Sequence, residues 1–223
     1  MKGKTAGVLS LMLLAGSLSG CAVPSGDSGY LVSPDETYET TGDSSEDYQL
    51  EDNAALYEDE NDTEVITMYL TAGRGNEEDG TDHTWTEINN HPLEYYEEQG
   101  IEPYKCEAVL QIGDEAGPVE GEFGYNDRTA NATVQLRGGS ASTWLQKSYR
   151  IKIKDKSGDW NGQKTISLNK HSADPVRFKN KLAYSLMEEI PQMLSARTAF
   201  VHLYVKDKTE GENGLFRDYG LYT

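Results

Sequence analysis

Three things are scarce in this chain of 223 residues: cysteine, long hydrophobic runs and, over residues 22–64, positive charge. The two cysteines are Cys21 and Cys106, so the fold cannot rest on a network of disulfides. Cys106 lies in the apolar run YKCEAVLQI, which favours a small buried hydrophobic residue over a nucleophile. The apolar stretch 8–15 is too short to cross a bilayer on its own.

Residues 1–20 have the features of a secretory signal. Lys2 and Lys4 precede the apolar stretch, and the sequence Leu-Ser-Gly-Cys ends at Cys21. This ending resembles a bacterial lipoprotein signal, in which the cysteine receives lipid where cleavage occurs. The alternative is an ordinary signal peptide with a chance cysteine. The lipoprotein interpretation predicts a protein held by acyl chains on the outer face of the cell membrane.

An acidic segment follows the signal. Residues 22–64 contain 14 Asp and Glu and no Lys, Arg or His. A segment with this charge and no apolar periodicity repels itself and cannot bury a core. We expect 21–64 to be a disordered tether that spaces the folded domain from the membrane. Binding of cations or a partner by the tract is the alternative.

Order is expected from Val65 to Thr223. Asp174 and Pro175 predict the start of a helix over 175–190. The order of elements predicts an α+β fold, mainly an antiparallel sheet with one packed helix. Because the sequence ends within an expected strand, we expect the domain to be truncated. The expected strands are 65–72, 104–113, 132–138, 148–155, 164–170, 197–207 and 215–223.

Positive charge gathers in one part of an otherwise acidic chain. The formal net charge is −18, yet residues 137–181 contain eleven Lys and Arg and three Asp, a local balance of +8. In the expected strand 148–155, Arg150, Lys152 and Lys154 alternate with apolar residues, so the cations share one face. Such a row is either a solvated face that protects a sheet edge or part of an anion site.

The turn before this strand favours the anion site. Gly138 and Gly139 remove side chains, so that backbone N–H groups can approach a ligand. Ser140 adds a hydroxyl, and Arg137 offers a planar fork for two phosphate oxygens. A glycine turn joining two strands, with a lysine on the second, is the local arrangement that protein kinases place over ATP.

Other ligand classes fit less well. The acidic chain, and the lack of expected exposed aromatic residues other than Trp144 near the basic segment, argue against nucleic acid. The four histidines have no metal-ligand spacing on a shared element, so no metal site is expected. A lipoprotein that captures a solute is a further alternative, and it predicts a closed pocket within 65–223.

Four ordered blocks carry a family resemblance. They are VQLRGGSASTWLQKSYRIKIKD, WNGQKTISLNKHSADPVRFKNKLAYSLMEEIPQM, RTAFVHLYVKD and FRDYGLYT, from about Ala132 to Thr223. Together they resemble the CotH kinase family, named for a spore-coat protein. Residues 65–131 fit less distinctly. Members are often secreted or lipid-anchored, in agreement with the signal that ends at Cys21.

The resemblance implies the N-terminal lobe of an atypical protein-kinase-like fold. It places Arg137 and Ser140 near the phosphates of ATP and makes Lys147 or Lys152 the lysine on those phosphates. Glu188 or Glu189 is the acid that orients this lysine. The metal-holding acids, for a divalent ion such as Mg²⁺, belong to a second lobe after the final Gly-Leu-Tyr, so we expect no catalytic residue and no activity in this fragment alone.

The sequence therefore predicts the N-terminal part of a CotH-like secreted lipoprotein kinase. In its full-length form it would phosphorylate Ser or Thr of secreted or cell-envelope proteins and would bind no nucleic acid. The alternative is a non-catalytic binding or scaffold module of the cell surface or spore coat.

Overall fold

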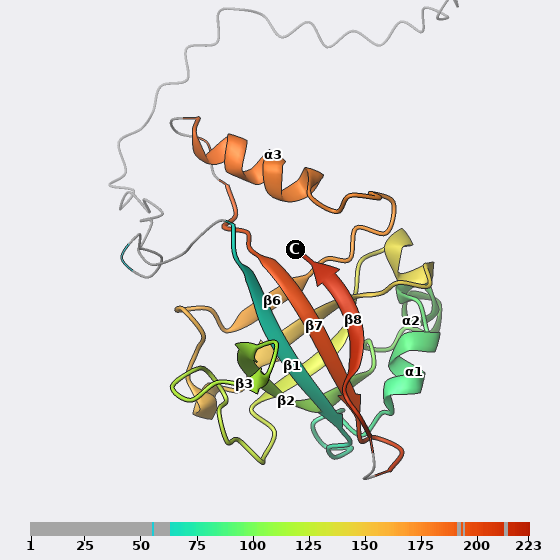
Figure 1. The fold of residues 1–223 in the computed structure, drawn as a ribbon. Coiled ribbons are helices and arrows are strands. Elements are labelled where there is room, and N and C mark those ends of the chain that lie inside the picture. Colours follow the sequence, from blue (N-terminus) through green and yellow to red (C-terminus); the bar gives the residue numbers. More distant parts are fainter. Residues whose placement is uncertain (1–54, 56–62, 191–192, 194, 212–213) are drawn as a thin grey trace, which may run out of the picture. The chain divides into compact units, whose positions relative to one another are not determined.

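The computed structural model describes residues 55, 63–190, 193, 195–211 and 214–223, which all belong to the unit Glu51–Thr223. An eight-stranded sheet makes up most of it (Figure 1). The strands are β1 (Val65–Gly73), β2 (Lys105–Asp114), β3 (Gly117–Pro118), β4 (Ala132–Arg137), β5 (Ser148–Ile153), β6 (Thr165–Leu168), β7 (Phe200–Asp207) and β8 (Arg217–Tyr222). The helices are α1 (Trp85–Asn90), α2 (Leu93–Gln99) and α3 (Lys179–Glu188), with short 3-10 helices η2 (Ser140–Thr143) and η3 (Asp155–Ser157).

The sheet is mixed. Its strands lie in the order β6-β5-β4-β2-β1-β7-β8, and β3 pairs with β2 away from this path. Every neighbouring pair is antiparallel except β1 and β7, which run parallel with Val65 beside Phe200. The expectation of a mainly antiparallel α+β sheet is therefore confirmed, with one parallel pair that the strand pattern did not predict.

The two edges of the sheet meet. Just after β6, the N–H of Asn169 donates to the carbonyl of Thr223 at 2.7 Å, and the N–H of Thr223 donates back at 3.0 Å. Thr223 directly follows β8, so these two bonds join the outermost strands of the path. The sheet consequently curls around its own core, and backbone groups that an open edge would leave unpaired are satisfied here.

Alternate side chains of the strands fill this core. In β2, β4 and β7 buried residues alternate with more exposed ones, as a sheet with one covered face requires. Ile151 and Leu203 are fully buried, and so is Cys106. The interpretation of Cys106 as a small buried hydrophobic residue is thus confirmed, and burial raises the pKa of its thiol.

Two short helices cover part of the sheet. Thr84 and Glu87 form a capping box that starts α1, because each side chain accepts a hydrogen bond from the other residue's backbone N–H. Trp85 of α1 is buried, stacks on Tyr149 with ring centroids 5.0 Å apart and donates its indole N–H to the Tyr219 hydroxyl. The sequence analysis did not predict α1.

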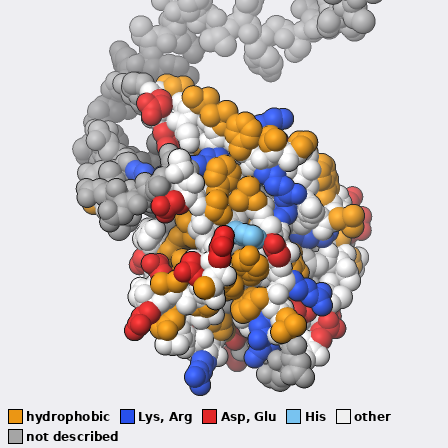
Figure 2. Space-filling view, viewed as in Figure 1, with side chains coloured by type: hydrophobic (Ala, Val, Ile, Leu, Met, Phe, Trp, Pro, Cys, Tyr) orange, Lys and Arg blue, Asp and Glu red, His pale blue; other side chains and the backbone are white. Residues whose placement is uncertain are grey.

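The third helix departs from the expectation of a packed helix. It begins at Lys179, because Arg177 takes a left-handed conformation with φ of 55° that interrupts the expected start. Its only buried residue is Lys181. The apolar residues Leu182 and Leu186 are exposed, and Figure 2 shows hydrophobic side chains along the rim where α3 lies. The strands fill the core together with Trp85 and Ile88 of α1, and α3 projects beyond the end of the sheet (Figure 1).

We expect core truncation to show how far stability depends on this packing. Ile151→Ala should lower the free energy of unfolding by about 2–5 kcal/mol, since it leaves a cavity in the core. Urea titration followed by circular dichroism measures it. Leu145→Ala is the control, because Leu145 is 99% exposed, and it should change stability by less than about 0.5 kcal/mol. Equal effects of the two substitutions would contradict the described core.

Candidate anion-binding site

Four basic side chains gather where the edges of the sheet meet. They come from the end of β4 and from the loop between β6 and α3, and we call them the cationic cluster: Arg137, Lys170, His171 and Arg177. Arg137 Nη1 donates to Asn169 Oδ1, and Asn169 is the residue that pairs with Thr223. The contact that closes the sheet thus also positions the cluster.

Lys170 lies deepest among the four. Its side chain is buried, its ammonium donates to the Tyr219 carbonyl, and it lies 4.1 Å from the centre of the Tyr222 ring. Its backbone N–H donates to Ser148 Oγ at 2.9 Å. Burial, with a smaller contribution from Arg177 and an opposing one from Asp218, lowers the pKa of Lys170 to about 8. A large part of its charge is therefore retained at neutral pH in a poorly solvated place.

Arg177 joins the loop to the cluster. Its Nη1 donates to the Lys170 carbonyl at 3.0 Å, and its Nη2 donates to Gln146 Oε1. Arg177 and His171 both have left-handed backbones, with φ of 55° and 47°. Residues other than glycine adopt this conformation at a cost of roughly 1 kcal/mol or more each, and such residues often cluster at functional sites.

His171 has an unsatisfied nitrogen. Its Nε2 is buried and has no hydrogen-bond partner among the described residues. Burial lowers the pKa of the imidazole, and the nearby charges of Arg137 and Arg177 lower it further, while Asp174 opposes them. A buried polar atom without a partner costs about 1–3 kcal/mol. An anion that accepts a hydrogen bond here would remove that cost.

Hydrogen bonds within and around the glycine turn hold its conformation. Gly138 has φ of 95°, which favours glycine. Ser142 is fully buried, donates to the Gly139 carbonyl at 2.6 Å and accepts from the N–H of Leu93 at 3.0 Å. Lys147 Nζ donates to the Ser142 carbonyl at 2.6 Å, and burial lowers its pKa. Lys147 therefore supports the turn in this arrangement.

The other predicted site residues lie apart from these contacts. Ser140 is exposed at the start of η2. Lys152 is exposed in β5, on the face away from the core, and Glu188 is exposed at the end of α3. No contact described in this structure joins Glu188 to Lys147 or Lys152. Of the five residues predicted to bind nucleotide, the structure thus brings Arg137 alone into the cationic cluster.

Sequence reasoning missed the other three members. Lys170 and Arg177 were counted in the basic segment but were given no role, and His171 was taken as ordinary. One signal was available: the polar run Asn169-Lys170-His171 directly follows the apolar end of β6. Polar residues that follow a buried strand lie at the rim of the core, where a ligand can reach them.

The cluster can bind an anion with several oxygen atoms. Two guanidinium groups offer pairs of N–H donors, Lys170 offers a positive charge, and His171 offers a ring nitrogen. Within the part of the chain that the structure describes, no three His, Cys, Asp or Glu side chains are grouped to hold a metal ion. None of the described helices has both the length and the apolar character to span a bilayer. Cys21, the predicted lipid site, lies outside the described residues.

Comparison with known families gives one match. Residues 134–223 match the family described as CotH kinase protein, and this segment contains the whole cationic cluster. No curated protein sequence matches the chain. The resemblance predicted from the sequence motifs is confirmed over residues 134–223, which match the CotH kinase protein family.

Proposed function

We propose that this chain is the phosphate-binding part of a CotH-like phosphotransferase, with the cationic cluster as the site for the phosphates of ATP. One observation carries the proposal: four basic groups surround the point where the sheet closes, with buried Lys170 among them. Desolvation, repulsion between like charges and backbone strain all oppose this arrangement. A bound polyanion offsets the first two, and the family match adds the expectation of a kinase-like role.

The residues present fit a chain of phosphates. Arg137 and Arg177 approach from different elements, so their planar forks can hold different phosphate oxygens. Lys170 adds a positive charge near Arg177, and His171 Nε2 offers a hydrogen bond that is otherwise unmade. When bound, ATP supplies the phosphoryl group for transfer. The residues of this chain bind and orient the phosphate oxygens.

Phosphoryl transfer in kinases also uses Mg²⁺ held by carboxylates. The family resemblance assigns those acids to a second lobe. We therefore assign nucleotide binding to the described residues and derive no metal-dependent step from them. The proposed substrates are Ser or Thr side chains of secreted or cell-envelope proteins.

The proposed location is outside the cytoplasm, on the outer face of the cell membrane. The signal over residues 1–20 and the lipid attached to Cys21 would provide it. The acidic tether of 21–64 would then separate the domain from the membrane. These features come from the sequence, and the experiment on Cys21 below tests them.

A non-catalytic scaffold is the second candidate function. The observation that favours it is the apolar surface of α3, where Leu182 and Leu186 are 47% and 59% exposed. Exposed apolar patches of this kind often mark protein-binding surfaces. The nucleotide titration below separates the two functions, because a pure scaffold requires no affinity for ATP.

We expect substitutions in the cationic cluster to weaken ATP binding. Lys170→Gln and Arg177→Gln each remove a charged donor, so each should cost about 1.5–3 kcal/mol, the range for hydrogen bonds to charged groups. This loss corresponds to a dissociation constant roughly 10- to 150-fold larger. Isothermal titration calorimetry measures it, and circular dichroism checks that each variant is folded.

Lys152→Gln is the matched control, since Lys152 is exposed on the outer face of β5. It also tests Lys152 as the lysine on the phosphates of ATP, a role that the sequence analysis suggested for Lys147 or Lys152. A large loss in Lys152→Gln with none in Lys170→Gln would assign the phosphates to the outer row of cations. Unchanged binding in all three variants would contradict both assignments.

ATP binding should weaken as the pH rises. Lys170 has a pKa of about 8, so its positive charge is present below pH 8 and is lost above it. Terminal phosphates ionise near pH 6, so the charge of ATP changes little in this range. Titrations from pH 7 to pH 9.5 should show the affinity falling, and Lys170→Arg should flatten the profile.

Lys170 should also make the stability of the ligand-free protein depend on pH. The pKa of Lys170 is lower in the fold than its ordinary value, so the unfolded chain binds the extra proton between about pH 8 and pH 10. The free energy of unfolding should therefore gain a rising contribution from Lys170 over this window. Lys170→Gln should remove that contribution. A flat profile in the original chain would contradict the described burial of Lys170.

The lipoprotein interpretation predicts the fate of Cys21. Cys21→Ala should leave the signal uncleaved by the lipoprotein pathway, because the thiol is the site of lipid attachment. Intact mass of the protein from bacterial membranes measures both lipid and cleavage. Normal maturation of the variant would show that residues 1–20 are an ordinary signal peptide.

A further inference from the structure

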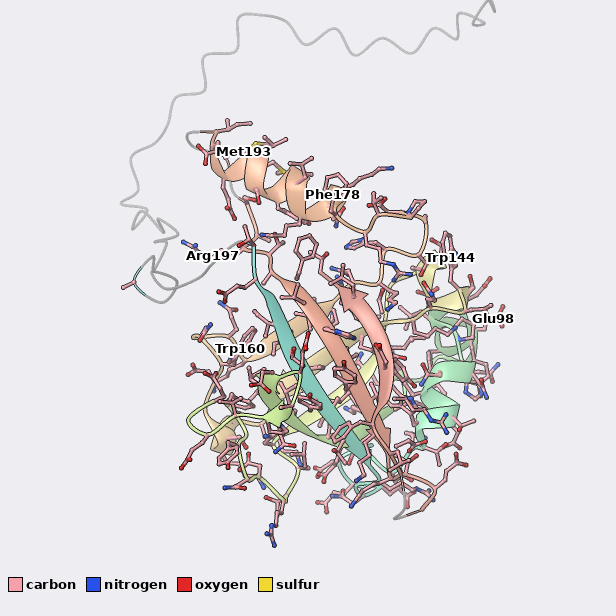
Figure 3. The ribbon with its side chains drawn as sticks, viewed as in Figure 1. Glu98, Trp144, Trp160, Phe178, Met193 and Arg197 are labelled. Atoms are coloured by element: carbon pink, nitrogen blue, oxygen red, sulfur yellow. The ribbon has the colours of Figure 1, made fainter. Side chains whose placement is uncertain are left out.

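The most exposed apolar surface on a regular element of the described chain lies on α3. Four large apolar residues follow one another at every fourth position, and we call them the α3 stripe: Phe178, Leu182, Leu186 and Ile190. They are between 44% and 59% exposed. Leu182 and Leu186 lie on one side of α3 because they are four residues apart, and Phe178 and Ile190 flank its two ends. Met193, at the far end of the helix from Phe178, is 46% exposed (Figure 3).

The charges of α3 oppose its own dipole. A helix favours acidic residues in its first turn and basic residues in its last. In α3 the first turn contains no acid and begins with Lys179, while the last turn contains no base and ends at Glu188, with Glu189 after it. Asp174, just before the helix, offsets the base at the first end, because it accepts a hydrogen bond from the Lys179 backbone N–H at 3.1 Å and lies 3.7 Å from the Lys179 ammonium. At the other end, Glu188 and Glu189 lie where the helix dipole destabilises them. This distribution of charges within α3 does not stabilise an isolated helix.

An antiparallel partner helix of the same sequence would cover the apolar residues of the α3 stripe and would bring opposite charges together at the helix ends. Its C-terminal end, with Glu188 and Glu189, would lie beside the Lys179 end of the first helix, and the opposite ends would match in the same way. A two-fold axis near Tyr184 would place Leu182 of one copy by Leu186 of the other. Ridges of residues four apart pack into each other in the commonest class of helix crossing.

We propose that α3 is a self-association surface, through which two copies of this chain form an antiparallel, two-fold symmetric dimer. A two-fold interface uses the same patch on both copies, and the α3 stripe with its inverted charges is self-complementary in this sense. The proposal does not depend on phosphate binding. One helix per copy buries less than the ~1,200 Å² of a standard interface, so the dissociation constant should be on the order of 10 μM.

Sedimentation velocity over a range of concentrations tests the proposal. The full chain would carry Cys21→Ala, so that lipid does not drive association. We expect a shift from monomer to dimer as the concentration rises, and monomer throughout for Leu182→Glu combined with Leu186→Glu. Leu145→Glu is the control, since Leu145 is 99% exposed in another part of the fold and should leave the dimer intact.

Charge reversal tests whether the two α3 helices of the dimer run antiparallel. Lys179→Glu alone, and Glu188→Lys combined with Glu189→Lys, should each weaken the homodimer. An equimolar mixture of the two variants should restore dimers. Circular dichroism checks that each variant keeps its helix, because Lys179→Glu also removes the ion pair with Asp174.

Three results would overturn the proposal. One is a monomeric chain at every concentration, as expected if another segment or another protein covers α3. The second is a dimer that persists when both leucines of the α3 stripe are replaced by glutamate. The third is a mixture of charge-reversed variants that associates no better than either alone, which would exclude the antiparallel arrangement.

Discussion

Two backbone hydrogen bonds, between Asn169 and Thr223, determine where the candidate site can exist. They join the ends of the outermost strands and bring the residue after β6 beside the end of β8. Lys170 then extends over the Tyr222 ring, and Arg137 reaches the Asn169 side chain. Sheet closure and the site consequently depend on the same few residues, so the site is as rigid as the strands that it joins.

The cationic cluster destabilises the ligand-free fold. Stability alone would favour uncharged or exposed residues at these positions, because burial of a charge without an opposite charge is unfavourable. Instead Lys170 is buried near Arg177, and both Arg177 and His171 hold left-handed backbones. An arrangement that costs free energy in the ligand-free fold, yet leaves a buried nitrogen unsatisfied, is more readily explained by a ligand than by folding.

The predictable part of the fold was the part governed by local periodicity. Period-2 alternation in β2, β4 and β5 revealed these strands, because each has one face on the core. The same alternation directed attention to Lys152, whose side chain the structure places on the outer face. Lys170 could not be selected in this way, since its burial depends on the contact between Asn169 and Thr223, 54 residues apart in the sequence.

The family match covers the site but not all of the scaffold that holds it. Within residues 134–223, β4 and β7 carry core residues, yet each pairs on one side with a strand from outside the match. β2 pairs with β4, and β1 runs parallel to β7. Without β1 and β2 the matched segment would have two unpaired strand edges and an incomplete core. Residues 65–131 are therefore part of the same folding unit, although they lie outside the family match.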